Sequence, residues 1–445
     1  MSLVAPTQQK ERIFVMDLLR GVALLGILMM NIPYFAESYQ LGENIFIRNE
    51  TSGADYYAWY IKALSFEGTM RALFSMLFGA GALLLLSRLE KKEMDITPAD
   101  FYYRRLMWLL LFGLINAFVL QWPGDILYSY ALCGLLLYPF RNMAARWLLI
   151  IGIFCMLVAT FKETYSWRKA WLVKEKGEKA LALQQQKKNL TEEQKEDLKT
   201  WQERQEKRKP ANVMKEVEKE RKEMLKGYFS ITGHLNGINV KIETFKFYHF
   251  FIWDALACFF IGMALFKWGV ITGMRSKKFY WILLITGYLV GFGINYFYIK
   301  TYLDIRMQFS YVYERLFINL YQERRLLQAL GHMSLLILLH KYNILKMLQV
   351  WLSRVGQMAF TNYLMQSIIC TTIFYGWGFG QFGQLRRVEW YYVMFVIWLF
   401  QVIFSNLWLH YFRFGPFEWL WRSLTYWKRQ PMLKEEAVEK NIALA

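Results

Sequence analysis

The segment 12–31 constrains the fold more than any other part of the chain, because it is apolar and yet carries an acid, a base and an amide. Asp17 and Arg20 are three residues apart, so they share one face of a helix and can pair. Asn31 returns nearly in line with Arg20, about 16 Å further along the axis. One polar edge on an apolar helix is typical of a membrane helix that faces other helices, because charge facing lipid costs several kcal/mol.

The composition supports a membrane protein. The 445 residues are 56% hydrophobic and 18% aromatic, and the formal net charge is +19. A basic balance can indicate nucleic-acid binding, but here the charges lie between long apolar runs. We therefore expect the cationic loops to face anionic lipid headgroups and expect no nucleic acid as a partner. The aromatic excess is typical of the belts at the two membrane interfaces.

Apolar runs of membrane length predict an all-α, polytopic membrane bundle of about ten transmembrane helices. The expected segments are 13–35, 57–86, 106–120, 126–138, 147–161, 250–266, 279–298, 326–345, 355–375 and 391–411. Most Lys and Arg of the loops fall on one side of this stack, and the positive-inside rule then places both termini in the cytoplasm. The pairs 324–325 and 386–387 fall on the other side, which a re-entrant turn would explain.

Four regions follow from this pattern. An N-terminal transmembrane bundle covers 12–161, and a charged helical insert outside the bilayer covers 162–248. A C-terminal transmembrane bundle covers 249–412, and a cytoplasmic amphipathic helix with a tail covers 413–445. The last region has Trp and Arg side chains at spacings that suit a helix lying on the membrane surface.

The insert is rich in Lys, Glu and Gln and is nearly free of long apolar runs. Thr191 and Gln194 have the spacing of a capping box, and Pro210 is expected to end a helix. We therefore expect two or three solvated helices. They serve either as a surface spacer or as a lid or docking arm over a membrane site.

Ionisable side chains within the apolar segments either belong to a functional site or form structural contacts between helices. Glu67 and Arg71 are four residues apart, a spacing that suits an ion pair. Gly79 and Gly81 follow on the same segment and let a neighbouring helix approach closely. Asp254 is the acid of the sixth segment. Each of these groups either holds helices together or lines a polar cavity.

Asn116 ends the third segment, and Asp125 opens the fourth, where a helix start stabilises a carboxylate. Asp125 is thus either a cap or a base at the mouth of a cavity. Asn362 and Gln366 are amides of the ninth segment, where interhelical hydrogen bonds are the simpler interpretation. The histidines lack metal-ligand spacing, so we predict no metal site. We expect the cysteines to be buried free thiols: Cys133, Cys155, Cys258 and Cys370.

Several motifs resemble, in order along the chain, those of the YeiB-like family of bacterial membrane proteins. They are DLLRG at 17–21, GILMMN at 26–31, LFSMLFGAG at 73–81, GDIL at 124–127, GQMAFTNYLMQ at 356–366 and FGPFEWLWR at 414–422. The fifth of these resembles the signature of the family's C-terminal domain of unknown function. The match covers nearly the whole chain outside the insert and implies a multi-pass protein of the bacterial cytoplasmic (inner) membrane.

The opening Asp-x-x-Arg-Gly of this family is similar to that of transmembrane acyltransferases. Those enzymes pass an acyl group from a cytoplasmic acyl-CoA to an acceptor at or across the bilayer. The resemblance implies acyl-CoA as a co-substrate and no permanently bound cofactor. Where the family often has His before the GDIL turn, this chain has Asn116, which cannot accept and hand on a proton at neutral pH.

We therefore expect a membrane acyltransferase with one shared polar cavity that takes a small-molecule or lipid-linked substrate. The catalytic candidates are Asp125, Asp17 and Asn116. The substrate-binding candidates are Arg20, Asn31, Glu67, Arg71, Asp254, Asn362 and Gln366. A transporter or flippase for an anionic or lipid-linked molecule would use the same charged interior. In a structural membrane protein, each charged pair would only hold two helices together. The expected partner is the lipid bilayer, and homo-oligomerisation stays open.

Overall fold

The computed structural model describes residues 12–91 and 97–434. In these ranges the regular elements are all helices, joined by turns and loops, with one isolated bridge between Phe412 and Leu433. The all-α fold class is therefore confirmed. The N-terminal elements are α1 Phe14–Ala36, α2 Tyr39–Glu43, α3 Gly53–Ile61, η2 Lys62–Phe66, α4 Thr69–Leu89, α5 Pro98–Leu114, η3 Ile115–Val119, α6 Leu127–Leu135 and η4 Tyr138–Phe140. The middle elements are α7 Ala145–Gln185, α8 Glu192–Arg208, α9 Pro210–Met224, α10 Tyr228–Lys241, η5 Ile242–Phe251 and α11 Ile252–Lys267. The C-terminal elements are α12 Lys277–Asp304, η6 Phe309–Tyr311, α13 Val312–Arg315, α14 Tyr321–Lys341, α15 Lys346–Gln357, α16 Ala359–Phe374, α17 Arg387–Tyr411 and α18 Pro416–Tyr426.

Six helical runs in the described part of the chain are long and apolar enough to cross a membrane. They are Phe14–Ala36, Gly53–Leu89, Ala145–Gln185, Tyr228–Lys267, Lys277–Asp304 and Arg387–Tyr411. The other four expected segments correspond to α5, α6, α14 and α16. These helices are shorter, as α6 is with 9 residues, or begin with several charged side chains, as α14 does.

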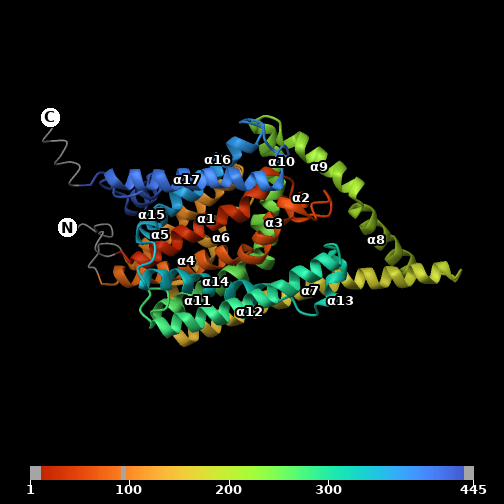
Figure 1. Cartoon of the computed structure of the whole chain (residues 1–445), viewed down its shortest axis with the longest axis horizontal. Helices are drawn as coiled ribbons and strands as arrows, with labels where there is room; N and C mark the ends of the chain where they lie inside the picture. Colours follow the sequence, from red (N-terminus) through yellow and green to blue (C-terminus); the bar gives the residue numbers. More distant parts are fainter. Residues whose placement is uncertain (1–11, 92–96, 435–445) are drawn as a thin grey trace.

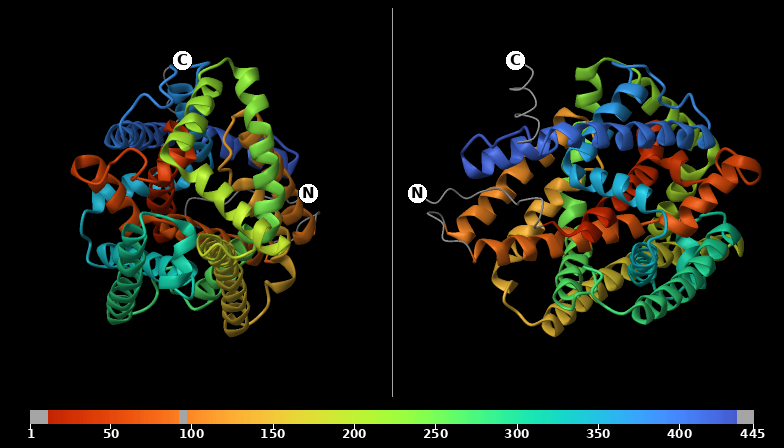
Figure 2. Two further views of the ribbon diagram at one scale, coloured as in Figure 1. Left: turned by 90° about the vertical axis from the view of Figure 1, so that its right-hand side faces the viewer. Right: turned by 60° about the vertical axis from the view of Figure 1, so that its left-hand side comes forward.

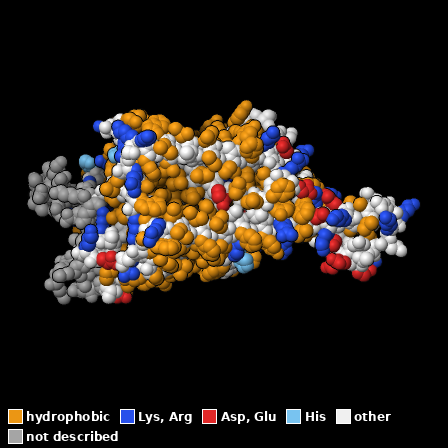
Figure 3. All heavy atoms as spheres, turned by 90° about the horizontal axis from the view of Figure 1, so that it is seen from below, with side chains coloured by type: hydrophobic (Ala, Val, Ile, Leu, Met, Phe, Trp, Pro, Cys, Tyr) orange, Lys and Arg blue, Asp and Glu red, His pale blue; other side chains and the backbone are white. Residues whose placement is uncertain are grey.

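The helices pack side by side into one elongated bundle with two different ends (Figure 1). We call the end where α17 finishes and α18 lies the α18 end, on the left of Figure 1, and the opposite end, where α8 and α9 project, the insert end. Hydrophobic side chains cover much of the middle, and Lys and Arg gather at both ends, mixed with more Asp and Glu at the insert end (Figure 3). This distribution is that of a protein embedded in a membrane.

Helices α4 and α11 cross in close contact at the centre of the bundle because each presents a glycine to the other. A Cβ atom on Gly79 would lie 2.3 Å from Phe259 O, and one on Gly262 would lie 2.0 Å from Met76 O. The close approach predicted for Gly79 is therefore confirmed. Gly81 instead faces the Arg20 side chain, whose guanidinium group occupies the position where a side chain of residue 81 would lie.

The insert begins within a continuous helix. Helix α7 is 41 residues long and passes from apolar into charged sequence without a break, while α8 packs back along it and α9 returns to the bundle (Figures 1 and 2). The predicted capping box of Thr191 and Gln194 is confirmed. The helix break predicted at Pro210 is confirmed too, because α8 ends at Arg208 and Pro210 is the first residue of the next helix, α9. The boundaries expected at 161 and 248 lie inside α7 and inside the α10–η5–α11 run.

Candidate functional site

A pocket at the α18 end extends into the bundle between α1, α4, α5, α6, α16 and α18. Its volume is about 290 Å³. On α4 the lining residues run from Phe74 to Arg88, which corresponds to about 21 Å of helix axis. The pocket is therefore long and narrow, with a charged mouth, an apolar middle and a floor of tyrosines.

The predicted pair of Asp17 and Arg20 is confirmed, and it lies at the mouth of this pocket. Arg20 Nη1 is 3.0 Å from Asp17 Oδ1, and Arg12 Nη1 is 3.8 Å from Asp17 Oδ2. One largely buried carboxylate thus serves two guanidinium groups. Together these three groups carry one net positive charge at the mouth.

Helices α5 and α18 bring two further arginines to the mouth. The Arg105 guanidinium lies 3.6 Å from the centre of the Trp421 ring, and Trp421 Nε1 donates to the Arg105 carbonyl at 2.9 Å. The Arg422 guanidinium lies 4.5 Å from the centre of the Phe414 ring. Burial, and then repulsion from Arg12, lower the pKa of Arg422 to about 10. Aromatic rings position both guanidinium groups but leave their charge uncompensated.

The pocket as a whole has a surplus of positive charge, because its lining contains five arginines and two carboxylates. Besides Asp17, the second carboxylate is Glu418, whose oxygens are engaged at the start of α16. They accept from Phe360 N at 2.7 Å, from Thr361 N at 3.0 Å and from the Thr361 hydroxyl. Glu418 is therefore a helix cap supplied by α18. The arginines are Arg12, Arg20, Arg88, Arg105 and Arg422.

Apolar side chains form the middle of the pocket, and two tyrosines lie at its inner end. The apolar residues include Phe74, Leu77, Phe78, Leu106, Leu109, Leu127 and Phe360. The Tyr130 hydroxyl hydrogen-bonds to Ser75 Oγ. The Tyr363 hydroxyl accepts from Ile126 N at 3.1 Å and donates to Asp125 Oδ1 at 3.3 Å. Tyr363 therefore connects the pocket to a carboxylate behind its floor.

Asp125 and Asn116 lie together directly behind Tyr363. Asn116 Nδ2 donates to Asp125 Oδ1 at 2.7 Å, and Tyr128 N donates to Asp125 Oδ2 at 2.8 Å. Asp125 is 5% exposed. One of its oxygens thus caps the start of α6, while the other is aimed at the pocket through Tyr363. The cap is therefore confirmed, whereas Asp125 lies behind the floor and not at the mouth of the pocket, and its role as a base stays a prediction.

Glu67 and Arg71 have other partners in place of the local pair suggested by their spacing. Arg71 Nη2 is 2.6 Å from Asp254 Oδ2, and Arg324 Nη2 is 3.6 Å from Glu67 Oε2. Arg325 also pairs with Asp254. None of these five residues lines the pocket. Arg324 and Arg325 belong to the regular helix α14 and are neutralised there, so no re-entrant turn accounts for them.

The predicted amides of α16 connect this helix to α17. Asn362 Nδ2 donates to Ser405 Oγ at 2.9 Å, and Gln366 Nε2 donates to Gln401 Oε1 at 3.1 Å. Gln401 Nε2 in turn donates to the Asn362 carbonyl at 2.8 Å. This is the interhelical bonding that the sequence favoured. Asn31 is half-buried on α1 and is not among the residues that line the pocket.

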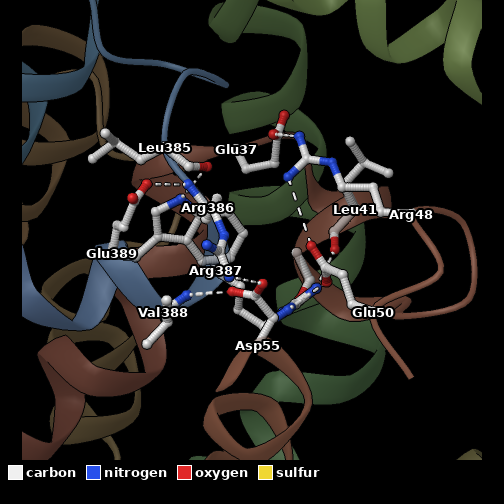
Figure 4. A network of polar contacts seen from close by, with 12 residues as sticks. Glu37, Leu41, Arg48, Glu50, Asp55, Leu385, Arg386, Arg387, Val388 and Glu389 are labelled. Atoms are coloured by element: carbon white, nitrogen blue, oxygen red, sulfur yellow. Dashed lines mark hydrogen bonds and ion pairs between the residues drawn. The ribbon is translucent and has the colours of Figure 1, made fainter. Parts of the chain in front are cut away.

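Arg386 caps α17 and Arg387 begins it at the insert end, where an acid before α3 and an acid in its first turn neutralise them (Figure 4). Arg387 is fully buried, and its Nε lies 2.7 Å from Glu50 Oε2. Its other nitrogens donate to two backbone carbonyls at 2.7 and 2.8 Å. Arg386 Nη2 is 2.9 Å from Asp55 Oδ2. These arginines also require no re-entrant turn.

A buried carboxylate anchors the insert to this end of the bundle. The Glu37 side chain at the end of α1 pairs with Arg48 and with Arg221 of α9. Arg221 contributes two contacts, from Nη2 at 2.5 Å and from Nε at 3.2 Å. The nearby Ser38 hydroxyl donates to Glu220. The insert is therefore held against the bundle by α9 as well as by α7.

Comparison with known proteins identifies relatives that extend over nearly the full chain. The chain is 32% identical to the uncharacterized protein YxaH of Bacillus subtilis over 98% of its length and 100% of that protein. It is 28% identical to the uncharacterized protein YeiB of Escherichia coli over 93% of its length and 96% of that protein. Residues 265–428 match a family model described as a protein of unknown function, DUF418. No solved structure matches significantly.

Proposed function

Because the chain belongs to the YeiB-like family of bacterial membrane proteins, whose compared members are uncharacterized, we propose a function from the pocket itself. The protein is a membrane acyltransferase that passes an acyl group from a cytoplasmic acyl-CoA-like donor to an acceptor at or across the membrane. The observation that carries this proposal is the division of one pocket into a cationic mouth, an apolar middle and a hydroxyl–carboxylate pair behind the floor.

The mouth suits the phosphates of the donor. Guanidinium groups bind phosphate oxygens through two parallel N–H donors, which makes arginine well suited to phosphate recognition. Arg20, Arg105 and Arg422 reach the mouth from three helices far apart in sequence, so they can contact more than one phosphate. The thioester end then extends along the apolar wall toward Tyr363.

The floor supplies the base for transfer. The acceptor oxygen attacks the thioester carbonyl, and its proton passes through the Tyr363 hydroxyl to Asp125. The carbon–sulfur bond breaks, and the CoA thiolate takes up the proton that Asp125 releases. Asn116 acts here by holding the Asp125 carboxylate, which accounts for an amide at a position that cannot itself be the base.

The donor side is the cytoplasm. We assign the chain about ten passes through the bacterial cytoplasmic membrane by adding α5, α6, α14 and α16 to the six long runs. The surplus of Lys and Arg at the α18 end then makes that end cytoplasmic, together with both termini. The pocket mouth opens on that side, where acyl-CoA is present.

The test is a comparison of donor binding with turnover in the purified full-length protein. We expect palmitoyl-CoA to bind in calorimetry and to release free thiol when a bacterial lipid extract supplies acceptors. Asp125→Asn and Tyr363→Phe should bind the donor as the wild type does and lose at least about 100-fold in turnover. The exposed substitution Glu203→Gln, which also replaces a carboxylate by an amide, should change neither quantity.

Two outcomes would contradict the proposal: absence of acyl-CoA binding, or full turnover in Asp125→Asn. A transporter would give a third pattern, in which proteoliposomes exchange a labelled anion across the bilayer and release no CoA thiol.

A further inference from the structure

Four buried oxygen atoms without hydrogen-bond donors belong to side chains of η3, α10 and η5, where these elements pack against one another and against α6, which begins two residues after Asp125. Asn116 Oδ1, Asn239 Oδ1 and both carboxylate oxygens of Glu243 accept no hydrogen bond within the described part of the chain. These side chains are 0%, 1% and 4% exposed. We call Asn116, Asp125, Asn239 and Glu243 the oxygen cluster.

Contacts on both sides of Glu243 orient it toward the turn before α6. Asn239, one helical turn before Glu243, donates from Nδ2 to a backbone carbonyl of η3 at 2.6 Å. Phe247, about one turn after it, packs against Tyr128 with ring centres 5.9 Å apart. Tyr128 N is the donor that holds Asp125 Oδ2. Residues one turn apart share a helix face, so Glu243 faces the same turn between these two contacts.

The backbone around the oxygen cluster is also unusual, because η3 and η5 are both π-helical. Wide turns of this kind occur often at functional sites in helices. No ion pair links Asp125 or Glu243 to a Lys or Arg anywhere in residues 12–91 and 97–434. Two carboxyl groups therefore lie inside the bundle without a cationic side chain, an arrangement that costs free energy unless they take up a proton or another cation.

We propose that the oxygen cluster binds a small monovalent cation of the Na⁺ class. Carboxylate and amide oxygens are the ligands that hard cations prefer, and interrupted helices supply such ligands in membrane transporters. A proton on Glu243 would satisfy one of the four orphan acceptors, whereas a cation can contact all of them. The described residues contain no group of three or more His, Cys, Asp or Glu that could hold a metal ion, so two carboxylates and two amides define a different kind of site. The inference does not rest on acyl transfer, and the two sites share Asp125 and Asn116.

Thermal unfolding of the purified full-length protein tests this site. Choline chloride should be replaced stepwise by NaCl at constant ionic strength, with LiCl and KCl as parallel series. We expect a saturable rise of the unfolding midpoint with Na⁺. At a concentration 100 times the dissociation constant, the unfolding equilibrium constant should fall about 100-fold.

Glu243→Gln should fold and lose the Na⁺ response, because it keeps the side-chain shape and removes one charge. Glu163→Gln is the matched control, since Glu163 also has a buried oxygen without a donor but lies on α7, bonded to Gln322. It should keep the full response. If Glu243→Gln does not fold, Asn239→Leu replaces it and should also lose the response. A wild type whose midpoint is the same in NaCl, LiCl, KCl and choline chloride would overturn the proposal, as would a full Na⁺ response in Glu243→Gln.

Discussion

The two ends of the bundle use arginine in opposite ways. At the insert end, Arg387 meets the carboxylate of Glu50 and two backbone carbonyls, and Arg386 meets Asp55 (Figure 4). At the α18 end, Arg105 and Arg422 lie against aromatic rings, and the carboxylates are outnumbered. An arginine that forms an ion pair with a carboxylate stabilises the fold. Where arginines outnumber carboxylates beside a pocket, their guanidinium groups can bind a ligand. The expected effects of mutation differ accordingly.

The largest effect is expected for Arg387→Ala. This change leaves Glu50 as a buried acid without its nearest partner and frees two carbonyls. Breaking a buried pair on one side costs about 3–5 kcal/mol, so the unfolding midpoint in detergent should fall sharply. Arg386→Ala is the control, because Arg386 is 65% exposed and such pairs contribute less than about 1 kcal/mol. Equal losses in the two variants would contradict the division between buried and exposed pairs.

A smaller loss of stability is expected on α4, where two glycines two positions apart face different surroundings. Gly79→Ala pushes a methyl group into the α11 backbone and should cost about 1–3 kcal/mol. Gly81→Ala meets only the end of the Arg20 side chain, at 2.9 Å, which can move into the pocket. Denaturant or thermal unfolding should therefore separate the two variants. A Gly81→Ala protein as unstable as Gly79→Ala would show that the Arg20 side chain is fixed.

The smallest effect concerns the ligand and leaves stability nearly unchanged. Arg422→Gln should weaken acyl-CoA binding about tenfold, or about 1.4 kcal/mol, which is near the lower end of what a hydrogen bond to a charged group contributes. Arg429→Gln removes the same charge outside the pocket lining and should leave the affinity as it is. Calorimetric titration of both variants, together with their unfolding midpoints, measures this. Equal affinities would show that the cationic mouth does not bind the donor.

Local signals in the sequence were sufficient for much of this structure. The all-α class, the pairing of Asp17 with Arg20 and the capping box at Thr191 depend on residues three or four positions apart. The same local rule failed for Glu67 and Arg71, because each finds a partner on another helix. Spacing along one helix identifies residues that can meet, but tertiary packing decides which of them do.

The site was less predictable because it is assembled from distant segments. Arg105 and Arg422 are far apart in sequence, and the sequence alone gives each the pattern of an ordinary loop or surface charge. Only the packing of α5 against α18 brings both to the pocket. Glu243 falls within the region expected outside the bilayer, so its burial beside Asp125 had no sequence signal. Tyr363 lies within a recognised motif, but only the folded chain shows that its hydroxyl reaches Asp125.

The position of α18 after α17, the last membrane-length helix of the described chain, determines when the pocket can form. Trp421, Arg422 and Tyr426 form one wall of its mouth, and Glu418 caps α16 from the same helix. The ribosome synthesises these residues after every membrane-length segment, so a nascent chain can insert fully while its mouth is still incomplete. Under the proposed function, ligand can therefore bind only after α18 has been synthesised, and a chain that stops before Pro416 would lack one wall of the pocket mouth.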